Sequence, residues 1–174
     1  MKQRIEEAKK ILLDNRKNGY TLPTNNKLYP AQWNWDSAFI ALGYSYFNLD
    51  YALEEMETLL AGQWDDGMVP HILFHDNDTT YFPNHTTWKC GKNIPSSGIT
   101  QPPVIASILK IILGNQQINE GQNNRVVQII KKIKKYHDWF IKFRDPNKTG
   151  LISILHPWES GYDNSPIWDV PMSN

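Results

Sequence analysis

The sequence predicts an all-α protein made of stacked helical hairpins, with long polar loops at one rim of the stack. The first observation is that apolar residues recur at helical spacing in five segments, with no alternation of strands and helices. The second is that short and long connections alternate, and that the long ones concentrate Pro, Gly and aromatic residues. The 174 residues suffice for a sizeable core, so we expect residues 1–174 to form a single domain.

The first helix is expected over residues 2–17. An apolar stripe runs along it, and Asn18-Gly19 supplies the left-handed conformation that often ends a helix. A Pro- and Asn-rich loop follows over residues 20–34. The stripe consists of Ile5, Ala8, Ile11 and Leu12.

The next two helices are expected over residues 36–47 and 50–62. Asp36 or Ser37 is the expected N-cap of the first, because short polar side chains accept bonds from the free N–H groups of a first turn. Gly62 is the expected stop of the second. The link of about three residues predicts that the two helices are antiparallel neighbours.

The loop over residues 63–100 is long for a compact domain, which is typical of a functional segment. Residues 68–74 have the composition of one short strand, but no partner strand is evident. A deeply buried helix, apolar almost all round, is expected over residues 101–114, with Pro102 in its first turn. A longer amphipathic helix is expected over residues 121–144, with its lysine-rich side facing solvent.

The composition argues against several classes of partner. Lys plus Arg and Asp plus Glu both number 18, so bulk charge favours neither nucleic acid nor an anionic membrane surface. The N-terminus lacks the apolar core of a signal peptide, and the longest apolar stretch, around residues 103–113, is too short to span a bilayer. The single cysteine, Cys90, excludes an intrachain disulfide. We therefore expect a cytoplasmic protein with no nucleic-acid and no membrane partner.

Seven tryptophans are present, and several lie in the predicted loops beside Asp, Asn and His. A large aromatic core is one interpretation; a sugar site with indole walls is the other, and the loop positions favour it. Four loop segments combine aromatic groups or amides with a carboxylate or a tight turn. They read YPAQWNWDS (29–37), WDDGMVPH (64–71), GITQPP (98–103) and HPWESGYDNSP (156–166). If the hairpins stack in a ring, these loops meet at one rim.

Two carboxylates in one pocket suit acid/base cleavage of a glycosidic bond, because one must donate a proton while the other is ionised. Glu159 and Asp163 form such a pair within the last loop. Tyr162 and Asn164 flank Asp163 and are groups that raise a carboxyl pKa by desolvation or hydrogen bonding. The alternative is that both carboxylates cap turns and backbone amides, a common role in Gly- and Pro-rich loops.

No metal or cofactor is expected. His71 and His75 have the i, i+4 spacing of helical zinc ligands, but Pro70 and the run over residues 72–74 do not form a helical pattern. The sharp Gly-x-Ser-x-Gly turn of serine hydrolases and a phosphate-binding glycine loop are also absent from the sequence.

Taken together, four motifs in order resemble glycoside hydrolase family 63. They are QWNWDSAFIALG, DGMVPH, SGITQPP and HPWESGYDNSPIWD, and the resemblance runs from about residue 28 to residue 169. The family includes mannosyl-oligosaccharide glucosidases and hydrolases of mannosylglycerate and glucosylglycerate. The resemblance implies an (α/α)6 barrel, an inverting mechanism and a small glycoside or oligosaccharide substrate.

The resemblance also implies roles for individual residues. Asp163 matches the general acid of the family. Trp33, Trp35 and Asp36 match the subsite that holds the cleaved sugar, with Asp36 accepting bonds from its hydroxyls. The other positions implied to contact substrate are Tyr29, Gln101, His71, Trp158, Glu159 and Trp168.

The general base of the family is a Glu near the end of the barrel, and nothing in this chain matches it. Five helices are expected here, whereas the barrel has twelve, so we expect a partial (α/α)6 toroid. Two alternatives to a hydrolase stay open: a sugar-binding module without catalysis, and a fragment that needs a partner chain to complete the barrel. Exposed helix faces in a partial barrel predict self-association.

Overall fold

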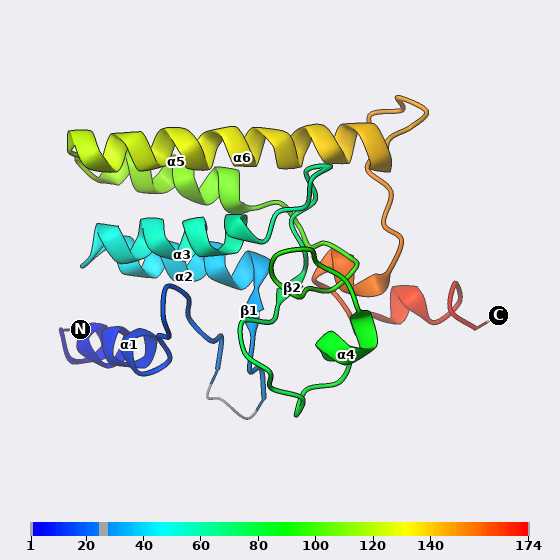
Figure 1. Ribbon diagram of the computed structural model, residues 1–174, viewed down its shortest axis with the longest axis horizontal. Helices are drawn as coiled ribbons and strands as arrows, with labels where there is room; N and C mark the ends of the chain where they lie inside the picture. Colours follow the sequence, from blue (N-terminus) through cyan, green and yellow to red (C-terminus); the bar gives the residue numbers. More distant parts are fainter. Residues whose placement is uncertain (1, 25–27, 174) are drawn as a thin grey trace.

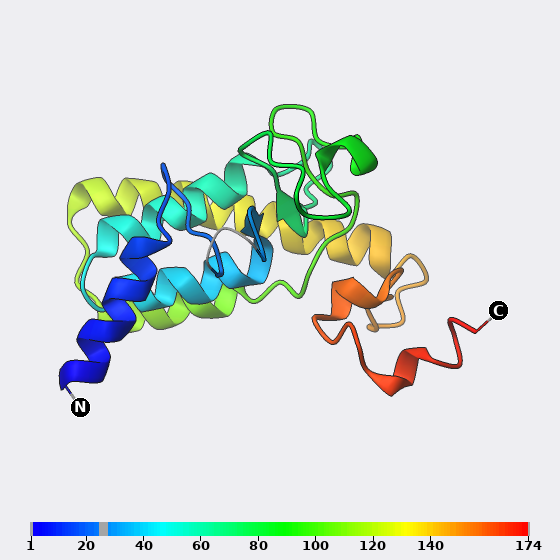
Figure 2. The ribbon, with the colours of Figure 1, turned by 90° about the horizontal axis from the view of Figure 1, so that it is seen from below.

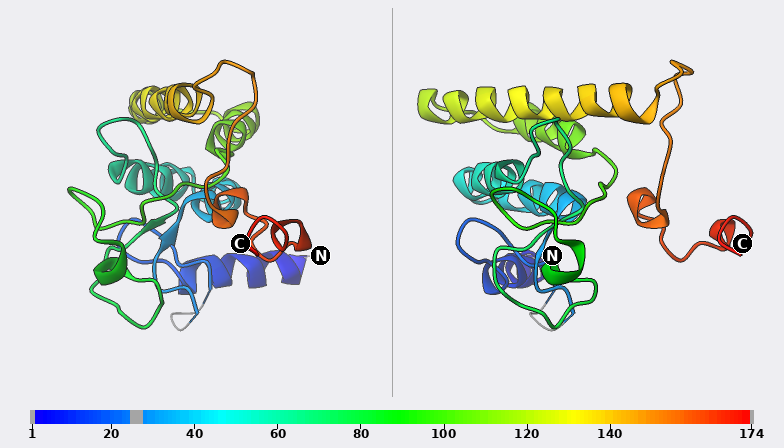
Figure 3. Two further views of the ribbon diagram at one scale, coloured as in Figure 1. Left: turned by 90° about the vertical axis from the view of Figure 1, so that its right-hand side faces the viewer. Right: turned by 45° about the vertical axis from the view of Figure 1, so that its right-hand side comes forward.

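The computed structural model describes residues 2–24 and 28–173, and this part of the chain is mostly helical. Two hairpins, α2–α3 and α5–α6, lie one above the other, and α1 forms a third layer (Figures 1 and 3). The long connections gather at one end of the stack. The elements are α1 (Lys2–Asp14), β1 (Gln32–Trp33), α2 (Asn34–Ser45), α3 (Leu49–Ala61), β2 (Ile72–Leu73), α4 (His85–Trp88), α5 (Ile105–Asn115), α6 (Glu120–Arg144) and the 3-10 helices η1 (Pro157–Ser160) and η2 (Pro166–Trp168).

The α2–α3 hairpin confirms the predicted antiparallel pair, with a link over residues 46–48. The Asn48 side chain accepts a bond from the Tyr51 backbone N–H and so caps α3. The start of α2 differs from the prediction: the N-cap is Trp33, without a side-chain cap, and Asp36 lies inside the first turn. Strand β1 keeps the chain extended as far as Trp33, and the helix begins where that pairing ends.

The α5–α6 hairpin begins four residues later than expected, at Ile105. Pro102 therefore precedes the helix and is not in its first turn. The cause is the Pro102-Pro103 pair, because a residue that precedes proline is driven away from the helical region. Helix α6 begins with a capping box in which Asn119 and Gln122 exchange bonds between side chain and backbone.

The main hydrophobic core lies between the two hairpins. It joins the buried faces of α2 and α3 to those of α5 and α6. The expected deep burial of α5 holds on one side, while Ile111 on the other is 43% exposed. On α6, Trp139 is buried, whereas Ile130 and Phe143 are exposed. Both helices therefore present apolar side chains to solvent.

The loop between α3 and α5 contains more order than the sequence indicates. Strand β2 lies within the expected segment 68–74, and it does have a partner: β1, antiparallel, with Gln32 opposite Leu73. A two-residue strand in a Pro- and Asn-rich loop has no detectable periodicity, which explains why the partner was not predicted. The single turn of α4 also lies in this loop.

Helix α1 ends at Asp14, three residues before the predicted end, because Arg16 pairs with Thr21 in an isolated bridge. Its apolar stripe is largely open to solvent, with Ile5 50% and Ile11 61% exposed. Leu12 packs against the main core. The Arg16 guanidinium forms an ion pair with Glu54 and lies 3.9 Å from the Tyr51 ring centre.

The chain after α6 leaves the stack and extends away from it (Figure 2). In the part of the chain that the structure describes, none of the helices combines the length and the apolar character needed to cross a membrane.

Glu55 on α3 is a buried carboxyl directly under β1, and burial raises its pKa from 4.5 to about 7. Bonds from Ser37 Oγ at 2.7 Å and Gln32 Nε2 at 3.0 Å offset part of that effect. Between pH 4.5 and 7 the folded protein keeps a proton that the unfolded chain releases. The contribution of Glu55 to the free energy of unfolding therefore falls as pH rises through this window, by about 3 kcal/mol, and this contribution is constant on either side.

We expect Glu55→Gln to remove that contribution, so that the slope of its stability against pH differs from that of the unaltered chain between pH 4.5 and 7. Denaturant unfolding at about pH 4, 5, 6, 7 and 8 measures it. Glu57→Gln, which changes a half-exposed glutamate on the same helix, should leave the slope unchanged. An unaltered slope in Glu55→Gln would contradict the assignment.

Candidate active site

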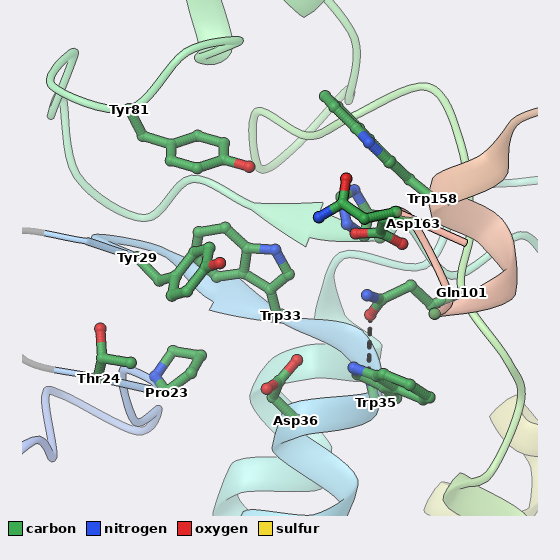
Figure 4. Close-up of a pocket in the computed structure, with 13 residues that line it drawn as sticks. Pro23, Thr24, Tyr29, Trp33, Trp35, Asp36, Tyr81, Gln101, Trp158 and Asp163 are labelled. Carbon is green, nitrogen blue, oxygen red and sulfur yellow. Dashed lines mark hydrogen bonds between the residues drawn. The ribbon is translucent and has the colours of Figure 1, made fainter. Parts of the chain in front are cut away.

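A cavity of about 420 Å³ opens at the end of the stack where the long loops gather. Four chain segments contribute to it: the stretch before and through the start of α2, the loop around β2, the approach to α5, and the segment around η1. Figure 4 shows their side chains pointing into one space. Eight of the ten residues predicted from the motifs line it: Tyr29, Trp33, Trp35, Asp36, His71, Gln101, Trp158 and Asp163.

Aromatic rings form one wall of the cavity. Trp33 is buried, and its indole makes edge contacts with Tyr29 at 5.0 Å and Tyr81 at 5.3 Å between ring centres. Trp35 lies on the first turn of α2, and Gly161 of the last loop packs directly onto its ring. The Trp35 indole is therefore held by its own helix and by Gly161 of the last loop, and a ring held in this way suits stacking against the apolar face of a sugar.

Asp36 is a carboxylate at the positive end of the α2 dipole. Burial raises its pKa, and hydrogen bonds from its own backbone N–H and from the Trp35 side chain oppose that shift. In Figure 4 its oxygens point into the cavity from the helix below. An acceptor in this place can bind sugar hydroxyls, as the motif predicts.

Gln101 is held from both ends. Its side-chain Oε1 accepts a hydrogen bond from the Trp35 backbone N–H at 3.1 Å. Its backbone carbonyl accepts a hydrogen bond from the Tyr136 hydroxyl at 2.9 Å. With Oε1 engaged, the NH₂ group is the end of this amide that can donate to a ligand (Figure 4). Gln101 thereby links the approach to α5 with the start of α2.

His71 is a neutral histidine against the cavity. Burial, followed by the neighbouring His156, lowers its pKa to about 3. Its ring centre lies 6.5 Å from that of Trp33 and 6.0 Å from that of Trp158. Its Nδ1 is buried and has no hydrogen-bond partner within residues 2–24 and 28–173.

Asp163 reaches the cavity from the loop after η1, on the side opposite Asp36 (Figure 4). Burial raises its pKa, and the nearby His156 acts in the opposite direction. A carboxyl with a raised pKa is suited to hold a proton until a leaving oxygen needs it.

Glu159 and Trp168 are the two predicted residues that the structure does not bring to the cavity. Both oxygens of Glu159 accept bonds from other parts of the chain, which corresponds to the alternative of carboxylates capping backbone amides. Trp168 Nε1 donates to the carbonyl of Tyr162 at 2.9 Å, within its own loop.

Five lining residues were not predicted. Gly161 and Asn164 belong to the same motif as Asp163, so the motif itself was the signal. Tyr81 comes from the long loop before α5, where no motif marks it. The other two, Pro23 and Thr24, come from the loop before β1.

Comparison with known proteins agrees with this geometry. The family model described as "Mannosylglycerate hydrolase MGH1-like glycoside hydrolase domain" matches residues 29–174. The chain belongs to this family. It is 44% identical over 172 residues to a mannosylglycerate hydrolase of Selaginella moellendorffii, covering 98% of this chain and 35% of that protein. A Thermus thermophilus mannosylglycerate hydrolase is 42% identical over 170 residues, covering 96% of this chain and 41% of that protein.

A solved structure gives the same result. The crystal structure of a family 63 mannosylglycerate hydrolase from Thermus thermophilus, in complex with Tris, matches with a TM-score of 0.91 at 41% identity. The match covers 97% of this chain and 40% of that one. The predicted family and the predicted fold, all-α and part of an (α/α)6 toroid, are thereby confirmed. The chain spans about two fifths of the length of the relatives it matches.

The contact between Gly161 and Trp35 gives a testable prediction. A methyl group at Gly161 would meet the Trp35 ring, and the φ of +66° adds the cost of a left-handed residue, about 1 kcal/mol. Gly150 has a similar φ of +80°, and a Cβ added there would meet nothing within 4 Å, so this position isolates the backbone cost. We expect Gly161→Ala to shift the NMR signal of the Trp35 indole N–H, and Gly150→Ala to leave it in place. An unmoved Trp35 signal in Gly161→Ala would show that the two groups do not pack.

Proposed function

We propose that this chain is a single domain, residues 1–174, that carries the sugar-binding and proton-donating part of an inverting α-glycosidase. The bond cleaved joins glucose or mannose to a small aglycone. The observation that supports it most is the cavity itself, in which Asp163 and Asp36 face a space walled by Trp33 and Trp35. Relatives at 42 to 44% identity are mannosylglycerate hydrolases.

The proposed chemistry begins with the sugar ring. Its apolar face stacks on the indoles, while Asp36, His71 and the Gln101 amide bond its hydroxyls. This places the glycosidic oxygen next to Asp163, which gives up its proton as the bond to the sugar breaks and becomes a carboxylate. Burial raises the pKa of Asp163, which favours the protonated form that a general acid needs.

Inversion requires a second carboxylate to activate water on the far face of the sugar, roughly 6.5–9.5 Å from the acid. Among the described lining residues the other carboxylate is Asp36, which we assign to sugar hydroxyls. The family resemblance implies a Glu base that has no match in this chain. We therefore propose that the base comes from outside these residues, and that the cavity alone binds sugar without hydrolysing it.

Calorimetric titration with glucose and with mannose tests the binding site. We expect one of the two to bind, Trp35→Ala to weaken it at least about tenfold through loss of stacking, and Asp163→Asn to retain most of the affinity. Tyr46→Ala, an exposed aromatic residue at the other end of α2, is the matched control and should bind normally. No binding of either sugar, or equal binding in Trp35→Ala and the control, would refute the site.

The same samples test the assignment of the base. Incubation of the unaltered chain with mannosylglycerate or glucosylglycerate should release no sugar. Turnover that disappears in Asp163→Asn would mean that a base is present within this chain.

A further inference from the structure

Glu159 lies in the same motif as Asp163, yet its side chain is turned away from the cavity into a buried ion pair. Arg144, the last residue of α6, donates from Nη2 to Oε1 at 2.6 Å and from Nη1 to Oε2 at 2.8 Å. The two residues are 5% and 6% exposed. A bidentate contact of this kind fixes the orientation of the carboxylate relative to the guanidinium as well as the distance between them.

The carboxylate of Glu159 also accepts two backbone bonds. Thr100 N–H donates to Oε1 at 3.3 Å, and Leu155 N–H donates to Oε2 at 2.9 Å. One side chain thus joins the end of α6, the approach to α5 and the segment that leads into η1. Thr100 is followed by Gln101, which holds the Trp35 backbone, so the contact reaches both walls of the cavity.

The segment that carries Asp163 has little else to hold it. Among residues 145–173, all of them described, Glu159 is the one buried residue, and residues 151–155 are exposed. Figure 3 shows this segment standing off from the helices. Segments with few buried contacts open locally at low cost, so the position of this one depends on the few contacts it has.

We propose that the Arg144–Glu159 ion pair positions the loop that carries Asp163, residues 156–164, which we call the acid loop. It holds η1 against the stack, so that Trp158 lines the cavity, Gly161 rests on Trp35, and Asp163 faces the bound sugar. The role of the loop in the reaction rests on the proposed function. The claim that the ion pair holds the loop in place is independent of it. Stability alone is a poor explanation for the pair, because apolar side chains in place of a buried ion pair are often as stable or more so.

Hydrogen exchange followed by mass spectrometry tests the device. We expect Glu159→Gln to speed amide exchange at least about tenfold over residues 156–164 and to leave α2 and α3 unchanged. Glu57→Gln is the matched control, because it removes the same charge from another ion pair with α6. In that pair Arg125 Nη2 lies 2.7 Å from Glu57 Oε2, and the pair is away from the cavity. The control should leave residues 156–164 protected. Equal protection in Glu159→Gln and the unaltered chain would overturn the proposal.

The double variant Arg144→Met, Glu159→Met separates positioning from stability. It leaves no unpaired charge, so we expect its melting temperature to return towards that of the unaltered chain. Exchange over residues 156–164 should stay fast, and the NMR-measured pKa of Asp163 should fall towards the ordinary value of an aspartate as its burial is lost. Recovery of protection and of the Asp163 pKa together with stability would show a purely structural role and overturn the proposal. This variant carries the test if Glu159→Gln does not fold.

Sugar affinity in the same variants distinguishes the two proposals. A loss of at least about tenfold in Glu159→Gln and in the double variant, with normal affinity in Glu57→Gln, supports both. If the unaltered chain binds no sugar while exchange responds as expected, the proposed function fails and the positioning device stands. If sugar binds normally in every variant and exchange is unchanged, the device fails and the binding site stands.

Discussion

The hydroxyl of Tyr136 is the contact on which the site depends. It is buried on the C-terminal half of α6, and burial raises its pKa to about 12, so it keeps its proton. Around it meet Asn34 Nδ2 at 3.2 Å, the Gln101 carbonyl at 2.9 Å and the Thr100 hydroxyl. A polar group so deep in the core must have its partners, and these partners come from the start of α2 and the approach to α5. The helical stack thereby fixes the two segments that carry Trp35 and Gln101.

The acid loop is held differently. The α2 side of the cavity is held by the core and by the pairing of β1 with β2. The loop with Asp163, by contrast, is joined to the stack chiefly through the contact of the Glu159 carboxylate with Arg144. The cavity therefore has one rigid side and one side of low local stability. Under the proposed function this division has a use: the proposed sugar-binding wall stays in place while Asp163, the proposed proton donor, retains some freedom to meet the leaving oxygen. One Pro-bounded loop thus carries two carboxylates with unlike environments: Glu159 lies in a buried ion pair, and Asp163 lies at the cavity.

The sequence predicts α2, α3, α5 and α6 well because each has a buried face, and burial leaves a countable spacing of apolar residues along the sequence. It does not predict the start of α2, since that is set by the pairing of Trp33 with Ile72 across the chain. Eight cavity residues were predictable through four motifs, whereas Tyr81 comes from a loop that carries no pattern. For Glu159 the motif indicated a substrate contact, and the structure shows an ion pair, because the spacing to Arg144 depends on how the chain returns to the stack. Local sequence patterns do not indicate the path by which the chain after α6 brings Glu159 next to Arg144.

The proposed function requires that this cavity holds a sugar with Asp163 on the oxygen at its anomeric carbon. A crystal structure of the chain soaked with glucose or mannose can show whether it does. We expect one ring stacked in the cavity against Trp35, its hydroxyls bonded to Asp36, and an Asp163 carboxyl oxygen within hydrogen-bond distance of the oxygen on C1. A sugar bound elsewhere, or in the cavity with that oxygen turned away from Asp163, would mean that the proposed function is wrong.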